Sequence, residues 1–132
     1  MSAAPAPASA REPRCRFIEH RGKQILFHDL SNITNPADGF PVIAQSKAIM
    51  VRQPLASVLA LTYVAHSRFN KEIVDALTEF VKHNKPYMKA SAIVGLAGLQ
   101  RVIYVTITQL TGRRLPTFDT IEAAKDWLVT QD

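Results

Sequence analysis

Hydrophobic and polar positions form their clearest pattern between residues 57 and 84. The run at 58–64, VLALTYV, is short, apolar and rich in β-branched and aromatic residues, which is typical of a strand covered on both faces. After a polar link, apolar residues recur with the spacing of one helical face, at Ile73, Val74, Leu77, Phe80 and Val81. Asn70 is a favourable N-cap, and Pro86 prevents a helix from continuing much beyond Lys85. This stretch therefore predicts a buried strand followed by an amphipathic helix.

The chain before this unit predicts a hairpin, a loop and a helix. Strand-like runs at 15–20 and 24–30 flank a Gly-centred link at 21–23, which is typical of a β-hairpin. Residues 31–38 are rich in side chains that hydrogen-bond their own backbone, and they are expected to form a loop. A helix should begin at 39–41 and end at about residue 53, because Pro54 follows.

The chain after this unit predicts two more strands and two more helices. A third buried strand is expected at 87–95, and a short edge strand at 115–118, where a proline is tolerated. Asp119 with Glu122 resembles a capping box at the start of a last helix. Its inner face would consist of Ile121, Ala124, Trp127 and Leu128.

Residues 97–111 combine the residue preferences of a strand with the periodicity of a helix. The run 102–108, VIYVTIT, favours a strand by composition. Four observations favour a helix instead. The segment is long, it carries an apolar stripe from Leu99 to Leu110, and Gly112 follows its end. A crossover is also needed between parallel strands. Further apolar residues, Tyr104 and Val105 among them, lie outside the inner stripe. They predict either cover by loops or a face for a homodimer or another partner.

The predicted order is β-β-α-β-α-β-α-β-α. It corresponds to an α/β fold in which an N-terminal hairpin joins a mixed, mostly parallel sheet packed by four helices. With 132 residues, 47% of them hydrophobic and 20% charged, residues 13–132 are expected to form one domain. Residues 1–12 are rich in Pro and Ala, and a disordered leader is expected there.

Composition also narrows the class of function. Cys15 is the single cysteine, so no intrachain disulfide is expected, and a reducing cytoplasm suits the chain. No secretory signal and no apolar run long enough to span a membrane is seen. The formal charge of +5 is not concentrated in a Lys/Arg stripe that alternates with aromatic residues, so nucleic acid is not an expected partner.

Candidate binding residues follow the predicted strands, at the edge where the carboxyl ends of parallel strands meet. They are Asp29, Ser31 and Asn32, then His66, Ser67, Arg68 and Asn70, and finally Gly95, Ala97 and Gly98 with Arg101 one turn later. Two helix N-termini and two arginines at one edge favour an anion, either a phosphate or a partner's carboxylate. Each residue also has a structural interpretation: helix caps, turn glycines, and arginines that are solvated or paired with Glu72 or Asp29.

The residues do not indicate a metal site or a catalytic site. His20 and His28 lie on adjacent predicted strands, but no third residue has ligand spacing to them. His66 next to Ser67 resembles a base and a nucleophile, but no residue that would orient the imidazole is evident. Cys15 is expected to be a small buried apolar group in the first strand. No cofactor is therefore expected.

Three stretches carry a resemblance to a known group of proteins. They are RFIEHRGKQILFHDLSN at 16–32, SRFNKEIVDALTEFVKHNKPYMKASAIVGLAGLQ at 67–100 and FDTIEAAKDWLV at 118–129. With the element order, they resemble bacterial single-domain STAS-like proteins, which are related to the anti-sigma-factor antagonists; the CRAL-TRIO lipid-exchange domains share the outline of the fold. The resemblance implies a non-enzymatic regulatory module that recognises a protein partner or a small anionic ligand.

The resemblance also leaves alternatives open. The antagonists carry an Asp-Ser pair whose serine is phosphorylated by a partner kinase. Here the sequence reads His66-Ser67-Arg68, so Ser67 is a candidate phosphosite that lacks the acidic neighbour. The CRAL-TRIO outline suggests a carrier of a small apolar or lipid-like ligand instead. A small hydrolase that uses Ser67 and His66 is a third alternative.

Overall fold

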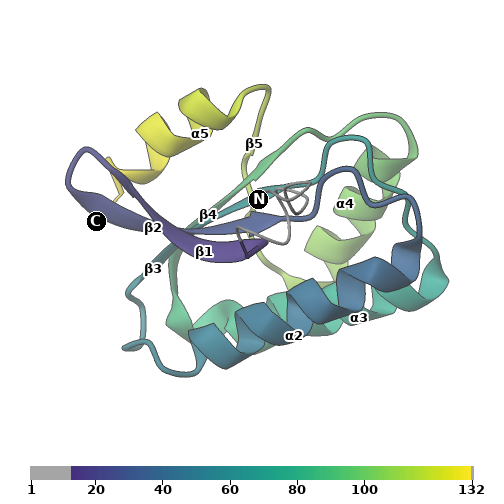
Figure 1. The fold of residues 1–132 in the computed structure, drawn as a ribbon, viewed down its shortest axis with the longest axis horizontal. Coiled ribbons are helices and arrows are strands. Elements are labelled where there is room, and N and C mark those ends of the chain that lie inside the picture. Colours follow the sequence, from purple (N-terminus) through teal and green to yellow (C-terminus); the bar gives the residue numbers. More distant parts are fainter. Residues whose placement is uncertain (1–12, 132) are drawn as a thin grey trace, which may run out of the picture.

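The computed structural model describes residues 13–131, so the leader predicted at 1–12 lies outside the described residues. The elements follow the predicted order (Figure 1). Their bounds are β1 Cys15–His20, β2 Lys23–Asp29, a 3₁₀ turn at Pro36–Asp38, α2 Gly39–Met50, β3 Val58–Tyr63, α3 Lys71–Asn84, a 3₁₀ turn at Lys85–Tyr87, β4 Met88–Val94, α4 Leu99–Thr111, β5 Thr117–Phe118 and α5 Ile121–Leu128.

The five strands form one sheet in the order β1-β2-β3-β4-β5. β1 is antiparallel to β2, and the other neighbouring pairs are parallel. In the hairpin, Cys15 lies opposite His28 and His20 lies opposite Lys23. The two residues between the strands, Arg21 and Gly22, have φ values of 52° and 82°, and positive φ at both central residues is the conformation that suits a tight hairpin. The predicted hairpin and the mixed, mostly parallel sheet are confirmed.

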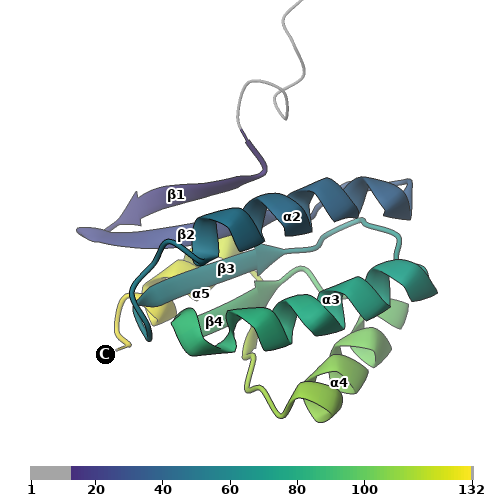
Figure 2. The same ribbon diagram turned by 90° about the horizontal axis from the view of Figure 1, so that it is seen from below.

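The helices lie on both faces of the sheet (Figures 1 and 2). Helices α2, α3 and α4 cover one face, and α5 lies on the other. The three crossovers that contain α2, α3 and α4 each advance by one strand in the same direction, so crossovers of one handedness place their helices on the same face. The sheet is therefore buried on both faces at its centre.

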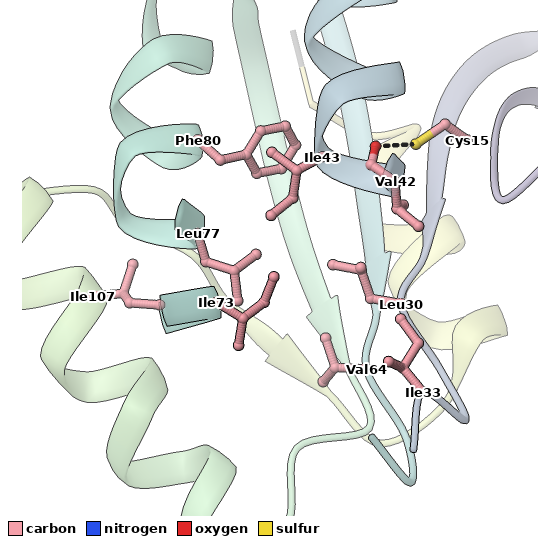
Figure 3. Close-up of a cluster of buried hydrophobic side chains, with 10 residues drawn as sticks. All are labelled: Cys15, Leu30, Ile33, Val42, Ile43, Val64, Ile73, Leu77, Phe80 and Ile107. Atoms are coloured by element: carbon pink, nitrogen blue, oxygen red, sulfur yellow. Dashed lines mark hydrogen bonds between the residues drawn. The ribbon is translucent and has the colours of Figure 1, made fainter. Parts of the chain in front are cut away.

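Apolar clusters fill both sides of the sheet. Residues of the β2 and β3 ends and of α2, α3 and α4 form the first cluster, which includes Leu30, Val64, Ile73, Leu77, Phe80 and Ile107 (Figure 3). Residues of β2, β3 and β4 pack with Ala124 and Leu128 of α5 in the second. Leu61, in the middle of β3, is completely buried. The uninterrupted apolar composition of β3 is explained by helices on both sides of it.

Residues 99–111 form helix α4, as predicted, and the helix ends before Gly112. Its outward face carries four exposed apolar side chains: Leu99, Val102, Val105 and Leu110. Of the two predicted outcomes for the apolar residues outside the inner stripe, cover by a loop is the one that applies to Tyr104. Tyr104 is half-buried, and its hydroxyl donates to the carbonyl oxygen of Leu115 at 2.5 Å, so the ring is fixed against the chain that leads to β5.

Some predicted element ends were also wrong. The last helix is capped by Thr120, whose hydroxyl accepts from the backbone N–H of Ala123 at 3.1 Å, and not by Asp119. Helix α2 ends at Met50, three residues before the predicted end, because residues 51–53 form a turn ahead of Pro54. Strand β5 comprises two residues where four were expected.

Candidate functional site

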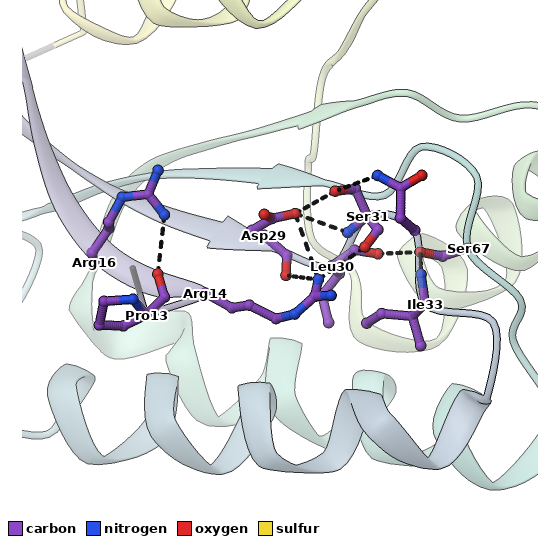
Figure 4. Close-up of polar contacts among 9 residues, drawn as sticks. Pro13, Arg14, Arg16, Asp29, Leu30, Ser31, Ile33 and Ser67 are labelled. Carbon is purple, nitrogen blue, oxygen red and sulfur yellow. Dashed lines mark hydrogen bonds and ion pairs between the residues drawn. The ribbon is translucent and has the colours of Figure 1, made fainter. Parts of the chain in front are cut away.

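Ser67 connects the loops that follow β2 and β3. Its hydroxyl donates to the carbonyl oxygen of Leu30 and accepts from the backbone N–H of Ile33 at 3.0 Å (Figure 4). The backbone adds two more bonds, from the N–H of Asn32 to the oxygen of Ala65 at 2.8 Å and from the N–H of Arg68 to the oxygen of Ile33 at 2.9 Å. These bonds hold residues 30–33 and 65–68 against each other at the carboxyl edge of the sheet.

Gln100 connects the loop after β3 to the first turn of α4. Its side-chain amide donates to the carbonyl oxygens of Val64 at 3.0 Å and Ser67 at 2.8 Å. Its side-chain oxygen accepts from the backbone N–H of Ala97 at 3.3 Å. Sequence reasoning missed this residue, and the only signal was a polar side chain in the first turn of a helix that follows a buried strand.

The loop after β4 approaches the loop after β3 closely at Gly95. A Cβ atom at this position would lie 2.9 Å from the backbone nitrogen of Ala65, and φ is +93°, so both space and conformation require glycine. The loops after β2, β3 and β4 therefore meet at one edge of the sheet, as predicted from the strand order.

A hollow of about 460 Å³ lies between the loop after β3 and the start of α4. Its lining combines polar and apolar side chains, and consists of His66, Ser67, Arg68, Phe69, Ala97, Leu99, Gln100 and Ile103. Gly98 lies between two lining residues and precedes α4. We call this hollow the rim pocket. It brings together the predicted residues His66, Ser67, Arg68 and Ala97.

Two exposed arginines belong to the segments that frame the rim pocket. Arg68 lines it, and Arg101 lies one turn into α4. Among residues 13–131, neither guanidinium has a hydrogen-bond or ion-pair partner, and both side chains are solvent-exposed. An exposed cation next to apolar lining residues suits a ligand that carries both an anionic group and apolar surface.

Four other predicted residues lie outside the rim pocket and have side chains with structural partners: Asp29, Ser31, Asn32 and Asn70. The Asp29 carboxylate accepts from the backbone N–H of Ser31 at 3.0 Å and from its hydroxyl at 2.5 Å (Figure 4). Arg14 lies 3.8 Å from that carboxylate and donates to the carbonyl oxygen of Ser31 at 2.8 Å. Arg14 and not Arg68 or Arg101 is therefore the arginine beside Asp29, so of the two structural interpretations, solvated or paired, Arg68 and Arg101 follow the first.

Two more predicted residues have local structural roles. The side-chain oxygen of Asn70 accepts from the backbone N–H of Ile73 at 2.9 Å, which confirms its N-cap role in α3. Asn32 has a φ of +57°, a conformation that asparagine adopts more readily than most residues, and its side chain donates to the hydroxyl of Ser31 at 3.4 Å. Neither side chain lines the rim pocket.

The hydroxyl of Ser67 is not placed to act as a nucleophile. Its proton is donated to the Leu30 carbonyl and its oxygen accepts from Ile33, so both partners are backbone groups and neither is a base. Cys15 is buried as predicted; burial raises the pKa of its thiol to about 12, and its Sγ donates to the carbonyl oxygen of Val42 at 3.3 Å. A thiol in this environment is not reactive.

The histidines are engaged in separate contacts. His28 is buried, with Nδ1 3.1 Å from the hydroxyl of Thr62 and Nε2 2.7 Å from that of Ser46, and burial lowers its pKa to about 4. The Nε2 atom of His20 lies 2.8 Å from a carboxylate oxygen of Asp126. Within residues 13–131, no group of three or more His, Cys, Asp or Glu side chains is arranged to hold a metal ion.

A second, apolar cavity lies deeper between the sheet, α3 and α4. It has a volume of about 80 Å³, and Leu77, Phe80, Ile107 and Leu115 are among its lining residues. Phe69, Gln100 and Ile103 line both this cavity and the rim pocket. We call it the core cavity.

In the part of the chain that the structure describes, no helix is both long and apolar enough to span a membrane.

Comparisons with known proteins identify the fold. No protein-family model matches the chain, and no curated protein matches it. A similar solved structure is that of an uncharacterised protein of the DUF3478 family with a SpoIIAA-like fold from Shewanella loihica PV-4. The two share 16% sequence identity with a TM-score of 0.60, over 86% of this chain and 91% of the other. The chain therefore has the SpoIIAA-like, or STAS-like, fold that the resemblance implied.

Proposed function

We propose that this protein is a non-enzymatic regulatory module that binds an anionic group, carried by a protein partner or a small ligand, at the rim pocket. The observation that carries the proposal is the pair of exposed guanidiniums without partners, Arg68 and Arg101, on segments that frame a hollow with apolar lining. Guanidinium groups bind carboxylates and phosphates through paired hydrogen bonds. The loops behind them are joined by several hydrogen bonds, so the site requires little ordering when it binds.

A protein partner fits this surface better than a free ion does. The exposed side chains of Leu99 and Val102, 71% and 61% accessible, extend the apolar surface of the rim pocket along α4. Val105 and Leu110 continue it toward the end of the helix. A segment with an acidic residue next to apolar residues would cover both the arginines and this surface, whereas an inorganic ion would cover only the arginines.

Phosphorylation of Ser67 would have a structural consequence that the binding proposal does not need. A phosphoryl group on that oxygen would remove the donor to the Leu30 carbonyl and place negative charge between the two loops. The contact between residues 30–33 and 65–68 would then open. A phospho-switch at Ser67 therefore implies a change in the loops as well as a change in charge.

The test is a charge-reversal comparison with a matched control. The wild-type protein and the double variant Arg68→Glu/Arg101→Glu are used to capture partners from the native cell lysate, which are identified by mass spectrometry. The control is Arg52→Glu/Arg114→Glu, which changes the net charge equally at exposed arginines outside the rim pocket. We expect a partner that the control retains and the double variant loses at least tenfold. Equal capture by all three proteins, or no specific partner and no anionic ligand in native mass spectra, would refute the proposal.

A second candidate function, a carrier of a small apolar ligand, is favoured by the core cavity. The cavity has a volume of about 80 Å³, and its lining is dominated by aliphatic and aromatic side chains. Cavities with such a lining bind small apolar molecules rather than water. Native mass spectrometry of protein purified from its host would detect a bound ligand as a discrete added mass, and its complete absence under gentle conditions argues against this function.

A further inference from the structure

A small polar recess adjoins the core cavity. A second cavity of about 30 Å³ lies next to it, and the two share the lining residues Thr62, Phe80, Val81, Ile93 and Leu115. The lining residues that the second cavity does not share with the first include the polar side chains of His28, Asn84, Ser91 and Arg113. The interior between the sheet and α3 therefore has an apolar cavity and, beside it, a smaller one with polar groups in its lining. We call the 30 Å³ cavity the polar recess.

Arg113 is the charged group of the polar recess, and its hydrogen-bonding capacity is incompletely used. Its guanidinium donates to the carbonyl oxygen of Val81 at 3.2 Å and, more weakly, to the hydroxyl of Ser91 at 3.4 Å. A guanidinium has five N–H donors. The side chain is half-buried, and among residues 13–131 no carboxylate lies within ion-pair distance of it. A partly desolvated cation is normally compensated by an anion.

The other titratable group of the recess does not supply this anion. His28 carries no negative charge in any state, and its two ring nitrogens are engaged by Thr62 and Ser46. Burial lowers the pKa of Arg113, in the direction expected for a cation that lacks a compensating charge. The protein thus presents a half-buried cation directly beside an apolar cavity, and a ligand would have to supply the negative charge.

We propose that the core cavity and the polar recess together bind a small carboxylic acid with a short apolar substituent. The carboxylate accepts from the guanidinium of Arg113 and from the hydroxyl of Ser91, and the substituent fills the space beside Phe80 and Ile107. This inference rests on the ligand-carrier function proposed above and gives it a ligand class. It makes Arg113 the residue that distinguishes acids from neutral molecules of the same shape.

The volumes limit the size of the ligand. An engineered cavity of about 150 Å³ binds benzene, so the roughly twofold smaller core cavity suits a group of about three to five carbon atoms. A recess of 30 Å³ holds about two groups of the size of water, which corresponds to the two oxygens of a carboxylate. A branched five-carbon acid fits both limits, and we therefore choose isovalerate as the probe.

The test compares isovalerate with isoamyl alcohol, which has the same branched chain without the charge. Binding is measured by titration in ¹H–¹⁵N and methyl NMR spectra of the full-length chain, with the Ile107 methyl groups as reporters of the core cavity. The variants are Arg113→Gln and, as a matched control, Arg114→Gln, because Arg114 is adjacent and exposed and lines neither cavity. Arg68→Gln serves as a control for binding at the rim pocket.

We expect saturable binding of isovalerate that shifts the Ile107 methyl signals. Arg113→Gln should weaken it at least tenfold, Arg114→Gln and Arg68→Gln should leave it unchanged, and the alcohol should bind at least tenfold more weakly than the acid to the wild-type protein. If the acid and the alcohol bind equally well, the core cavity holds ligands but the role of Arg113 is refuted, while the carrier function stands. If neither binds, both proposals fail. If Arg68→Gln abolishes binding, the acid binds at the rim pocket and the inference is overturned. The comparison of acid and alcohol uses the wild-type protein, so it decides the question even if Arg113→Gln does not fold.

Discussion

Acidification to pH 4 should destabilise the protein mainly through one residue, His28. Its imidazole is 1% exposed, both ring nitrogens lie at hydrogen-bonding distance from hydroxyls, and its ring centre is 5.4 Å from that of Phe80 in an edge-on arrangement. Arg113, another cation, lines the same polar recess. A proton on His28 would therefore place an uncompensated charge in the core, and burial lowers the pKa of this histidine from 6.5 to about 4.

The pKa shift fixes both the sign and the size of the effect. Above pH 6.5 the imidazole is neutral in the folded and the unfolded chain, and it contributes no pH dependence. Between pH 6.5 and about 4 only the unfolded chain takes up the proton, so the free energy of unfolding falls by about 1.4 kcal/mol per pH unit, or about 3 kcal/mol in total. The carboxyl of Asp126, whose pKa is lowered by its hydrogen bond to His20, affects stability only at lower pH.

Urea denaturation, followed by circular dichroism at pH 7, 6, 5 and 4.5, measures this dependence. His28→Gln should be less stable than the wild-type protein at pH 7 but should lack the loss between pH 6.5 and 4.5. The control is His66→Asn, because His66 is exposed and has a φ of +61°, which asparagine tolerates. This control should keep the wild-type pH dependence. If the wild-type protein and His28→Gln lose stability in parallel over this range, the buried imidazole is not the cause and the reasoning is wrong.

Three further substitutions test the frame of the candidate site. Asn70→Ala removes the N-cap bond of α3 and should lower the free energy of unfolding by about 1 kcal/mol in urea denaturation; an unchanged value would mean that water replaces the cap. Gly95→Ala introduces a Cβ atom 2.9 Å from the backbone nitrogen of Ala65 at a position where φ is +93°. It should lower the thermal midpoint of unfolding clearly more than Gly112→Ala, which lies at an exposed position. Ser67→Ala leaves the backbone N–H of Ile33 without its acceptor, and should lower the free energy of unfolding by about 1–3 kcal/mol. It should also accelerate hydrogen exchange at Ile33, and exchange at the wild-type rate would contradict the proposed connection between the loops.

The elements that the sequence predicts well are those in which periodicity and termination signals agree. Helix α3 has a regular apolar stripe, an Asn cap and a proline after its end, and its observed bounds, Lys71–Asn84, match. Helix α4 shows a different case, because its residue preferences favour a strand over 102–108. Topology decides there: parallel β4 and β5 need a crossover, and the only segment long enough to supply it is this one.

Contacts between distant residues account for most of what the sequence did not predict. Arg14 pairs with Asp29 across 15 positions and Gln100 bonds to Ser67 across 33, and no local pattern marks either pair. The inward position of Tyr104 depends on the carbonyl of Leu115, which belongs to a segment without regular structure. The periodicity of a helix predicts which side chains face the sheet. It does not predict which of the remaining side chains are covered by a loop, because the sequence does not show where that loop runs.

The fold itself does not select among the proposed functions, because a scaffold shared at 16% identity fixes the strand order but not the side chains at its edge. In this protein, individual side chains determine which groups the carboxyl edge of the sheet offers to a ligand. The side chains of Ser67 and Gln100 form hydrogen bonds with backbone groups of the loops. The guanidinium groups of Arg68 and Arg101 have no partner among residues 13–131 and remain available to a ligand. Ser67 and Gln100 therefore hold the loops of the site together, whereas Arg68 and Arg101 face solvent. Phe69, Gln100 and Ile103 line both the rim pocket and the core cavity, so a ligand that fills the core cavity would contact the same side chains that support the rim. For this reason binding at the rim and binding in the core have to be measured with separate variants, as Arg68 and Arg113 allow.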